Sequence, residues 1–399
     1  MNETSNNLPD MLTGEQLEEQ EQRAREAEVR QYLLDARQNY PEPYYMLEYK
    51  GVPFSTLGGI QALSGQKKNG KTFVLAQLMA AILSEGKERT QQYLAGLQVP
   101  DRTIRYLREK TNDPHYLPTV LYVDTEMEKL NSAKVLRRVH WLCDWQMDVP
   151  NDRFHVLWLR GVTDVKDSEG KVAERAYAKR YRLIRMAIEI LHPDAVFIDG
   201  IRDIIGDFND NAESAQLVGE LMALAEQENI CIWNTLHMNP RPGNDDESKM
   251  RGHLGTELGN KITDTLVSIK KKDSSGVTFT VKQLDARNKD MDDWKFEVTD
   301  ASGALGIPRI ITTICPSKQP EHDDVADIKA WIKEAEDKLT WPMTRNDVKQ
   351  KIFGEIGGQK NNDKRQADLN VALNLNYLVE SPIKKKGFYL LEIGDNIPF

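Results

Sequence analysis

Eight residues from Gly65 to Thr72, GQKKNGKT, combine residue types and a spacing that can bind phosphate groups. They match the pattern of a glycine, four variable residues, a second glycine, a lysine, and a serine or threonine. The two glycines would let the backbone wrap around phosphates, so that N–H groups point at negative charge. Lys71 would reach the β- and γ-phosphates, and the Thr72 hydroxyl would ligate Mg²⁺.

The flanking sequence supplies the context that this motif needs. The apolar run IQALS before it predicts a strand, and the amphipathic stretch TFVLAQLMAAIL after it predicts a helix. This context disfavours the structural alternative, a glycine turn with an incidental lysine. We therefore predict that the chain binds a nucleoside triphosphate with Mg²⁺ through Gly65, Gln66, Lys67, Lys68, Asn69, Gly70, Lys71, Thr72 and Phe73.

Two further predicted strands end in carboxylates. Asp199 ends the apolar run AVFID, where it would support Mg²⁺ together with Thr72, although an aspartate there can also simply cap a loop. The run VLYVDTE brings Asp124 and Glu126 to the end of another strand. Either carboxylate could orient and deprotonate an attacking water, and Asp124 could instead cap the helix that follows.

A polar cluster ends another apolar run, ICIWNTLHMN. Asn234, Thr235 and His237 would lie where a γ-phosphate is sensed, and a buried, hydrogen-bonded histidine is the structural alternative. Further along the chain, Arg251 lies in MRGHLGTELGN and Arg287 lies in FTVKQLDARNKD. Surface arginines are usually solvated, so residue type alone assigns neither of them a role.

Between about residues 50 and 300, short apolar runs alternate with helical stretches. The runs predict strands at Ile60–Leu63, Val120–Val123, Phe154–Leu159, Ala195–Ile198, Ile230–Trp233, Thr265–Ile269 and Thr278–Val281. The stretches between them predict helices at Thr72–Leu83, Ser132–Trp145, Ala176–Leu191 and Ala212–Glu228. This alternation predicts an α/β fold with a mostly parallel central sheet covered on both faces. Residues 85–118 would form a polar insertion, and residues 161–175 an exposed loop.

Changes in composition divide the chain into four parts. Residues 1–48 form a polar arm, residues 49–307 the α/β core, residues 308–324 a linker, and residues 325–399 a C-terminal module. The module suggests three helices followed by a hairpin, which resembles a winged-helix domain.

Lysines and one arginine mark the surfaces of the C-terminal module that would contact duplex DNA. Lys364 and Arg365 lie in its third helix, the expected recognition element, and the turn of the hairpin contains Lys384, Lys385 and Lys386. However, residues 321–399 contain 14 acidic and 12 basic residues, so the module is not basic overall. Docking to a protein partner is therefore the alternative to duplex binding.

The overall composition excludes several classes of protein. The 399 residues include 53 basic and 62 acidic side chains, a formal net charge of −9, which argues against a uniformly basic nucleic-acid coat protein. No stretch approaches the roughly 18 uninterrupted apolar residues of a membrane span, and the first residues do not form a secretory signal. The cysteines, Cys143, Cys231 and Cys315, are too few and scattered for a disulfide framework or a zinc site. We expect a reduced, cytoplasmic protein.

Taken in order, the motifs resemble those of the RecA-like P-loop ATPase superfamily, most closely the ring-forming replicative helicases of plasmids (the RepA kind). The resemblance covers roughly residues 50–300. It rests on GQKKNGKT, VLYVDTE, FIDGIRDI, NTLHM and RGHLGTELGNKITD.

This resemblance implies a role for several residues. Glu126 would activate water, Asp199 would support Mg²⁺, and His237 would sense the γ-phosphate. An arginine from the neighbouring subunit would complete each site. Arg251 matches the arginine–glycine segment of the plasmid helicases. Arg287 matches a K-x-R segment of the broader bacterial replicative helicases, although Asp285 stands where that segment has lysine.

The resemblance further implies ATP hydrolysis coupled to movement along single-stranded DNA by a homo-oligomer, a hexamer being one form. Loops around PRPGNDDESKM and residues 260–272 would face the central channel, where phosphates would be contacted by Lys249, Arg251, Lys270, Lys271 and Lys272. The acidic DDE in the first loop argues against a simple basic channel. The alternative function is a nucleotide-gated DNA-binding regulator or adaptor that does not unwind DNA. A small-molecule kinase fits less well, because the sequence has no clear lid signature.

Overall fold

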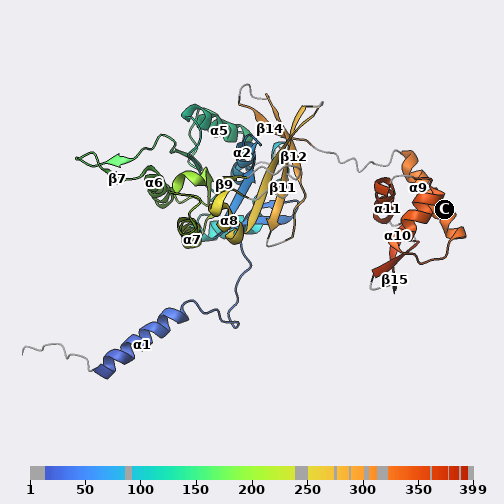
Figure 1. Ribbon diagram of the computed structural model, residues 1–399, viewed down its shortest axis with the longest axis horizontal. Helices are drawn as coiled ribbons and strands as arrows, with labels where there is room; N and C mark the ends of the chain where they lie inside the picture. The colour runs from blue at the N-terminus through green and yellow to red at the C-terminus, as the bar shows by residue number, and fades with distance from the viewer. Residues whose placement is uncertain are drawn as a thin grey trace, which may run out of the picture.

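The computed structural model describes residues 14–85, 92–238, 250–273, 276–286, 289–300, 305–311, 322–359, 362–375, 377–385 and 388–393. The fold is mixed α/β, and its centre is a nine-stranded sheet in which parallel pairs outnumber antiparallel pairs (Figure 1). The predicted fold class, with its RecA-like P-loop core, is therefore confirmed.

The order of the strands brings the predicted site residues to one edge of the sheet. In space the order is β14 (Ile307–Ile310), β12 (Trp294–Thr299), β11 (Gly276–Ala286), β10 (Asp264–Asp273), β3 (Ile60–Gly65), β9 (Cys231–His237), β8 (Ala195–Asp199), β4 (Val120–Asp124) and β5 (Phe154–Trp158). The strands from β10 to β5 are parallel, so their carboxyl ends lie together. Gly65 pairs with His237, and Asp124 pairs with Asp199.

Two hydrophobic layers cover the sheet. On one face lie α2 (Lys71–Leu83), α4 (Asp101–Thr111), α5 (Lys129–Leu142) and a hairpin of β1 (Tyr45–Tyr49) and β2 (Val52–Thr56). On the other lie α6 (Ala176–Leu191), the 3-10 helix η1 (Ile201–Ile204), α7 (Asn211–Glu228) and α8 (Gly252–Lys261). Burial from both sides explains why β3, β4 and β8 are nearly continuous apolar runs rather than alternating ones.

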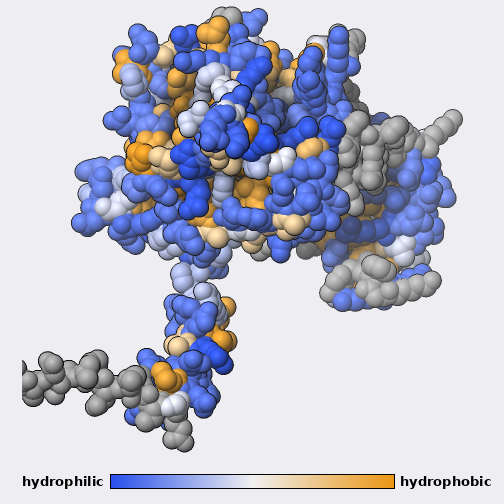
Figure 2. Space-filling model, turned by 60° about the vertical axis from the view of Figure 1, so that its left-hand side comes forward, coloured by the Kyte–Doolittle hydropathy of each residue, from blue (hydrophilic) through white to orange (hydrophobic). Residues whose placement is uncertain are grey.

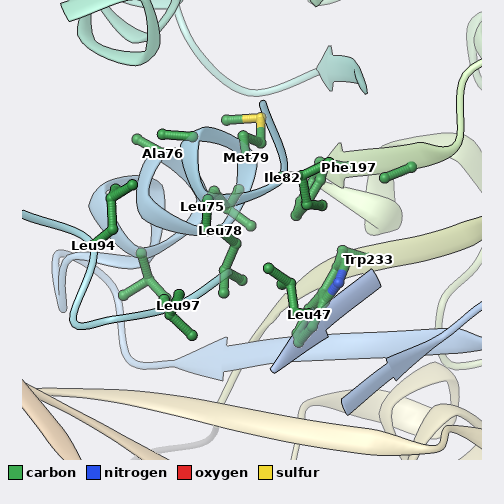
Figure 3. Packing of buried hydrophobic residues seen from close by; sticks show 14 of the residues in the cluster. Leu47, Leu75, Ala76, Leu78, Met79, Ile82, Leu94, Leu97, Phe197 and Trp233 are labelled. Carbon is green, nitrogen blue, oxygen red and sulfur yellow. The ribbon is translucent and has the colours of Figure 1, made fainter. Parts of the chain in front are cut away.

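Helix α2 differs from the predicted amphipathic helix. Every residue from Val74 to Leu83 is buried, because the β1–β2 hairpin and the 92–111 segment cover the side that would otherwise face solvent. Figure 3 shows Leu75 and Leu78 of α2 among Leu47 of β1, Leu97 and Trp233. A helix that is apolar on all sides needs such a complete cover.

The sheet domain extends further at both ends than the predicted core of residues 49–307. Strand β1 contains Met46 and Leu47, which are fully buried, and β14 continues to Ile310 by pairing with β12. The predicted insertion contains α4, and residues 161–175 contain a short hairpin of β6 (Val165–Lys166) and β7 (Val172–Glu174). Residues 312–321, most of the predicted linker, lie outside the described residues.

The described part of the N-terminal arm, residues 14–48, contains the helix α1 (Gly14–Arg30), whose described side chains are exposed. Figure 2 shows that the visible face of the molecule is mostly hydrophilic, with scattered hydrophobic patches. In the described part of the chain, no helix is both long and apolar enough to cross a membrane.

The C-terminal module has its own hydrophobic core, which includes Ile332, Phe353, Leu369 and Leu391. Its elements are α9 (His322–Lys338), α10 (Arg345–Asp347), the π-helix η3 (Val348–Ile356), α11 (Asn362–Asn374), β15 (Leu378–Lys385) and β16 (Phe388–Ile393). The helices and the antiparallel hairpin follow the predicted order. The identification as a winged-helix domain stays a prediction.

The packing of the core predicts that replacement by alanine lowers the free energy of unfolding at one leucine and leaves it nearly unchanged at another. Leu78 of α2 is 0% exposed and Leu130 of α5 is 80% exposed. Leu78→Ala should lower the free energy of unfolding by about 2–5 kcal/mol, because it removes buried methyl groups and leaves a cavity. Leu130→Ala should change it by less than about 0.5 kcal/mol. Denaturant unfolding followed by tryptophan fluorescence measures both values, and equal losses would contradict this packing.

Candidate nucleotide-binding site

The loop between β3 and α2 has glycines where a side chain would collide with the sheet. Gly65 has φ +152°, and a Cβ atom there would lie 2.7 Å from the Ser268 carbonyl oxygen of β10. Gly70 has φ +81°, and its Cβ would lie 2.6 Å from the ring of Phe279 on β11. The loop thus combines left-handed backbone geometry with close packing, and both require glycine. It leaves a backbone cradle at the start of α2, which suits phosphate groups.

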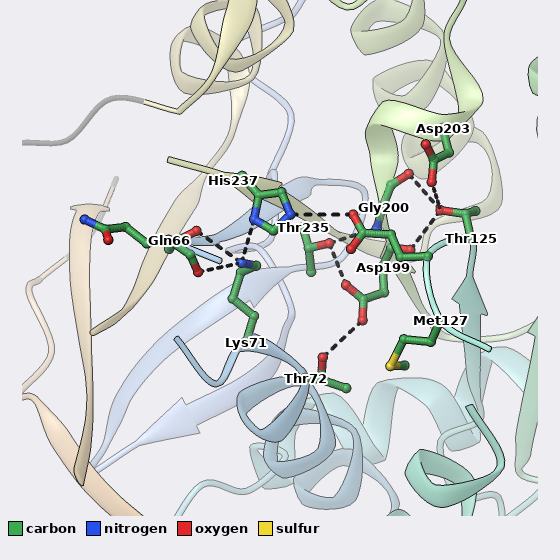
Figure 4. A network of polar contacts seen from close by, with 12 residues as sticks. Gln66, Lys71, Thr72, Thr125, Met127, Asp199, Gly200, Asp203, Thr235 and His237 are labelled. Atoms are coloured by element: carbon green, nitrogen blue, oxygen red, sulfur yellow. Dashed lines mark hydrogen bonds and ion pairs between the residues drawn. The ribbon is translucent and has the colours of Figure 1, made fainter. Parts of the chain in front are cut away.

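Lys71 is buried at the centre of this edge of the sheet. Its ammonium group donates hydrogen bonds to the carbonyl oxygens of Gly65 and Gln66, each at 3.1 Å, and to Nδ1 of His237 at 3.0 Å (Figure 4). Burial lowers the pKa of Lys71, and the negative charges of Asp199 and Glu126 act in the opposite direction. An ammonium group held in this way can exchange its loop carbonyls for phosphate oxygens.

The carboxylate of Asp199 lies beside the Thr72 hydroxyl. Asp199 accepts hydrogen bonds from Thr235 at 2.7 Å and Tyr122 at 2.9 Å, and its Oδ2 is 3.5 Å from Thr72 Oγ1. Burial raises the pKa of Asp199, and the two hydrogen bonds oppose that shift. Oxygen donors such as these are the ligands that Mg²⁺ prefers, and it takes few from the protein when it also binds phosphates. Thr72 and Asp199 therefore fit the predicted Mg²⁺ site.

The two carboxylates after β4 have different environments. Asp124 is fully buried and accepts hydrogen bonds from the backbone N–H groups of Glu126 and Met127, each at 2.9 Å, and from the Ser132 hydroxyl. Asp124 thus holds the turn between β4 and α5 and bonds to Ser132 within the helix. It does not cap α5, because the N-cap residue of that helix is Glu128. Glu126 instead lines a pocket together with Lys71.

Glu126 has the protonation behaviour expected of a general base. The side chain of Glu126 is 42% exposed, so its burial is only partial. This partial burial, together with the negative charges of Asp199 and Asp203, raises its pKa to about 7, and the charge of Lys71 opposes the shift. A pKa near the working pH lets a carboxylate accept a proton in the reaction and release it afterwards.

A hydrogen-bond network that the sequence did not reveal positions Glu126. The Thr125 hydroxyl contacts the Gly200 carbonyl oxygen at 3.0 Å and Asp203 Oδ2 at 2.9 Å (Figure 4). Gly200 has φ +105°, and a Cβ there would lie 2.2 Å from Thr125 Oγ1 and 2.8 Å from Glu126 Cγ. The residues of this network lie in the sequence segments DTE and DGIRD. The two segments meet only because β4 pairs with β8, which the sequence does not show.

His237 lies between the lysine and the glutamate. Its Nε2 is 3.9 Å from Glu126 Oε1, while its Nδ1 faces Lys71. Burial and the charge of Lys71 lower the pKa of His237, so near pH 7 the ring is neutral and Nδ1 accepts the lysine hydrogen bond. The pocket beside these groups is lined by Lys71, Glu126, Arg202, Phe208, Thr235, Leu236, His237 and Arg251.

The other residues of the predicted sensor and arginine segments lie in different places. Asn234 is buried in the sheet, and its amide donates to the Gln61 and Ile232 carbonyl oxygens, so it faces away from the pocket. Arg251, one of the two predicted candidates for action in trans, lines the pocket of its own chain, and its action in trans stays a prediction. Arg287 lies outside the described residues.

The structure also describes three further residues that the sequence predicts as contacts, Phe73, Lys270 and Lys271. Phe73 packs against the rings of Phe279 and Phe296, with centroids 6.2 and 6.5 Å away. Lys270 and Lys271 are exposed on β10, and the ammonium group of Lys270 is 5.9 Å from the Phe279 ring. Lys249 lies outside the described residues.

The residues of the C-terminal module that were predicted to contact DNA differ in their surroundings. Lys364, Lys384 and Lys385 are exposed. The guanidinium group of Arg365 instead donates to Gln359 O and to Gln350 Oε1, each at 2.6 Å, so it joins parts of the module. Lys386 lies outside the described residues.

The environment of Glu126 predicts a pH dependence. Only the carboxylate can accept a proton from water, so kcat/KM for ATP hydrolysis should rise with pH through about 7. Because the charge of Asp203 raises the pKa of Glu126, Asp203→Asn should move this limb to lower pH while keeping an acceptor for Thr125. The ionisation of ATP itself is common to both proteins. Steady-state measurements of kcat/KM between about pH 5 and 9 give the pH at which activity rises. The same pH in wild-type and variant protein would contradict the assignment of Glu126 as the general base.

The comparisons with known proteins agree with this geometry. The family model of the AAA domain matches residues 23–240, more than half of the chain. No curated protein matches the chain at a significant level. The matched segment includes the phosphate loop, Glu126, Asp199 and His237. The chain therefore belongs to the AAA domain family and is a nucleotide-hydrolysing P-loop ATPase with a RecA-like core.

Proposed function

We propose that the chain is a ring-forming, DNA-associated ATPase that moves along single-stranded DNA, a helicase of a plasmid, phage or mobile element. The observation that carries the ATPase part is the alignment of Lys71, His237 and Glu126 in one pocket, with contacts of 3.0 and 3.9 Å between successive groups. The motor part rests on the resemblance to plasmid replicative helicases.

In the proposed reaction, each residue has a defined task. The loop amides and Lys71 bind the phosphates of ATP, and Glu126 orients a water and accepts its proton as the water oxygen attacks the γ-phosphorus. The bond to the β-phosphate oxygen breaks, and ADP and phosphate leave. His237 reports the presence of the γ-phosphate because it contacts Lys71 on one side and faces Glu126 on the other. Mg²⁺, held by Thr72 with Asp199 in support, neutralises phosphate charge when bound.

The packing of the loop supports a link between the nucleotide and the proposed DNA contacts. Gly65 and Gly70 touch β10 and β11, and the Ser268 hydroxyl donates to the Asn69 carbonyl oxygen. The same strand carries Lys270 and Lys271, which are exposed. A change in the loop would therefore reach the lysines along one rigid strand. Exposed lysines bind nucleic acid through its phosphates, without base specificity.

Oligomer formation is part of this proposal. In the related motors an arginine of the next subunit completes each site, and Arg287 remains the candidate for this role. Catalysis by sites that a neighbour completes makes turnover depend on assembly.

A DNA-binding regulator or adaptor that uses ATP without unwinding is the second candidate. The C-terminal module, with its own core and with Lys364, Lys384 and Lys385 exposed, supports this alternative. In that case the module would bind a duplex or a protein, and the nucleotide would set the assembly state.

Strand displacement from a forked DNA substrate tests the proposed function. Wild-type protein should separate the strands with ATP and Mg²⁺, single-stranded DNA should stimulate turnover, and a non-hydrolysable ATP analogue should promote assembly. Lys71→Ala should lower kcat by about 100-fold or more and abolish unwinding, because it removes the phosphate-binding charge. Turnover without unwinding in any assembled form would favour the regulator, and an absence of turnover would contradict both candidates.

A further inference from the structure

Two arginines of the same chain flank one aromatic ring beside the nucleotide pocket. The guanidinium carbon of Arg202 lies 4.1 Å from the centroid of the Phe208 ring, and that of Arg251 lies 5.9 Å from it. Both distances are within the range of cation–π attraction. The three side chains line the pocket that also contains Lys71 and Glu126.

Each of the three residues is positioned by a different segment. Arg202 belongs to η1, directly after β8, where Ile201 and Ile204 are buried and Arg202 is exposed. Phe208 precedes α7, and Arg251 precedes α8. The backbone N–H of Arg251 donates to the His237 carbonyl oxygen at 2.9 Å. The backbone of Arg251 is therefore held at the end of β9, the strand that carries the proposed sensor.

Phe208 is a fixed platform rather than a loose side chain. Its carbonyl oxygen accepts a hydrogen bond from the N–H of Leu254, in the first turn of α8, at 3.0 Å. Gly252 has φ +77°, and a Cβ there would lie 2.5 Å from the Phe208 ring. The glycine thus lets the ring pack against the start of α8, next to Arg251.

The charges around the pocket favour an anion. Its lining includes three cationic side chains, Lys71, Arg202 and Arg251, and the single carboxylate of Glu126. Within the described ranges, neither guanidinium group forms an ion pair with a carboxylate. Two like charges on one ring repel each other, and a polyanion between them removes that cost. A guanidinium group also matches the geometry of phosphate oxygens.

We propose that Arg202 and Arg251 bind the terminal phosphate of ATP in cis, with Phe208 as their positioning residue. This inference rests on the proposed function and adds Arg202 as a catalytic residue. During hydrolysis the two groups stay protonated and neutralise the charge on the departing phosphoryl group, while the proton of the water goes to Glu126. Each protomer thus provides these two arginines for its own site.

Nucleotide affinity tests the contact separately from turnover. Arg202→Ala should weaken binding of a non-hydrolysable ATP analogue by about 10-fold or more and leave ADP binding within about 2-fold, because only ATP has the terminal phosphate. The matched control is Arg185→Ala, an exposed arginine on α6 outside the pocket lining. It should leave both affinities unchanged. Equal effects of the two substitutions would overturn the proposal.

Turnover and conservative variants provide the second measurement. Arg202→Ala should lower kcat by about 100-fold or more. Arg202→Lys should recover only part of it, because lysine keeps the charge but lacks the planar fork. Phe208→Leu should lower kcat, and Phe208→Tyr, which keeps the aromatic face, should restore it. Full activity of Phe208→Leu would overturn the positioning role.

Mixed oligomers decide between cis and trans action. Arg202→Ala and Lys71→Ala protomers should show no recovery of turnover when mixed, because each lacks part of its own site. Recovery would place Arg202 at the neighbour's site and overturn the inference. If the wild-type protein is active and the Arg202→Ala variant is equally active, this inference is wrong but the proposed function is not contradicted. Inactive wild-type protein would contradict the proposed function itself.

Discussion

The buried ammonium group of Lys71 is the charge around which this edge of the sheet is organised. Removing a charge from water is costly unless hydrogen bonds and opposite charges replace the lost hydration. Two loop carbonyls and His237 supply the hydrogen bonds, and Asp199 and Glu126 supply negative charge nearby. The phosphates of a nucleotide would meet the same need more fully, so the site is prepared for them.

The loop that carries this lysine is also part of the packing of the sheet. A side chain at Gly65 or Gly70 would collide with β10 or β11, and the Ser268 hydroxyl of β10 bonds to the Asn69 carbonyl oxygen, so the loop packs directly against those strands. On the other side, the pairing of β4 with β8 brings Thr125, Gly200 and Asp203 together and places Glu126 beside the pocket. Phosphate binding, the general base and the β10–β11 hairpin therefore belong to one connected structure.

The local pattern of apolar and polar residues predicted much of the fold and of the nucleotide site. Buried parallel strands are continuous apolar runs, and the carboxyl ends of such strands lie together, so GQKKNGKT, VLYVDTE, AVFID and NTLHM could be assigned to one site from the sequence. The structure agrees in bringing Lys71, Glu126, Asp199 and His237 together.

Long-range packing explains what the sequence could not show. Phe208 has no motif around it, and its role depends on contact with Gly252, which follows a different strand. The resemblance left Arg251 and Arg287 as alternatives for an arginine of the neighbouring subunit, and it could not show that the backbone N–H of Arg251 bonds to His237 or that Arg251 lines the pocket of its own chain. Helix α2 is buried all round only because the distant β1–β2 hairpin and the 92–111 segment cover it. The strands β12 and β14 were missed because both are short and partly polar, and such strands carry a weak pattern.

The Mg²⁺ dependence of ATP binding tests the central claim, that the nucleotide lies on the loop with Thr72 and Asp199 beside its metal ion. Equilibrium binding of a fluorescent ATP analogue should be compared with Mg²⁺ and with a chelator, in wild-type protein and in the Thr72→Ser and Thr72→Ala variants. Wild-type and Thr72→Ser protein, which keep the hydroxyl, should bind more tightly with Mg²⁺, and Thr72→Ala should lose most of that difference. Equal Mg²⁺ dependence in all three proteins would contradict the account.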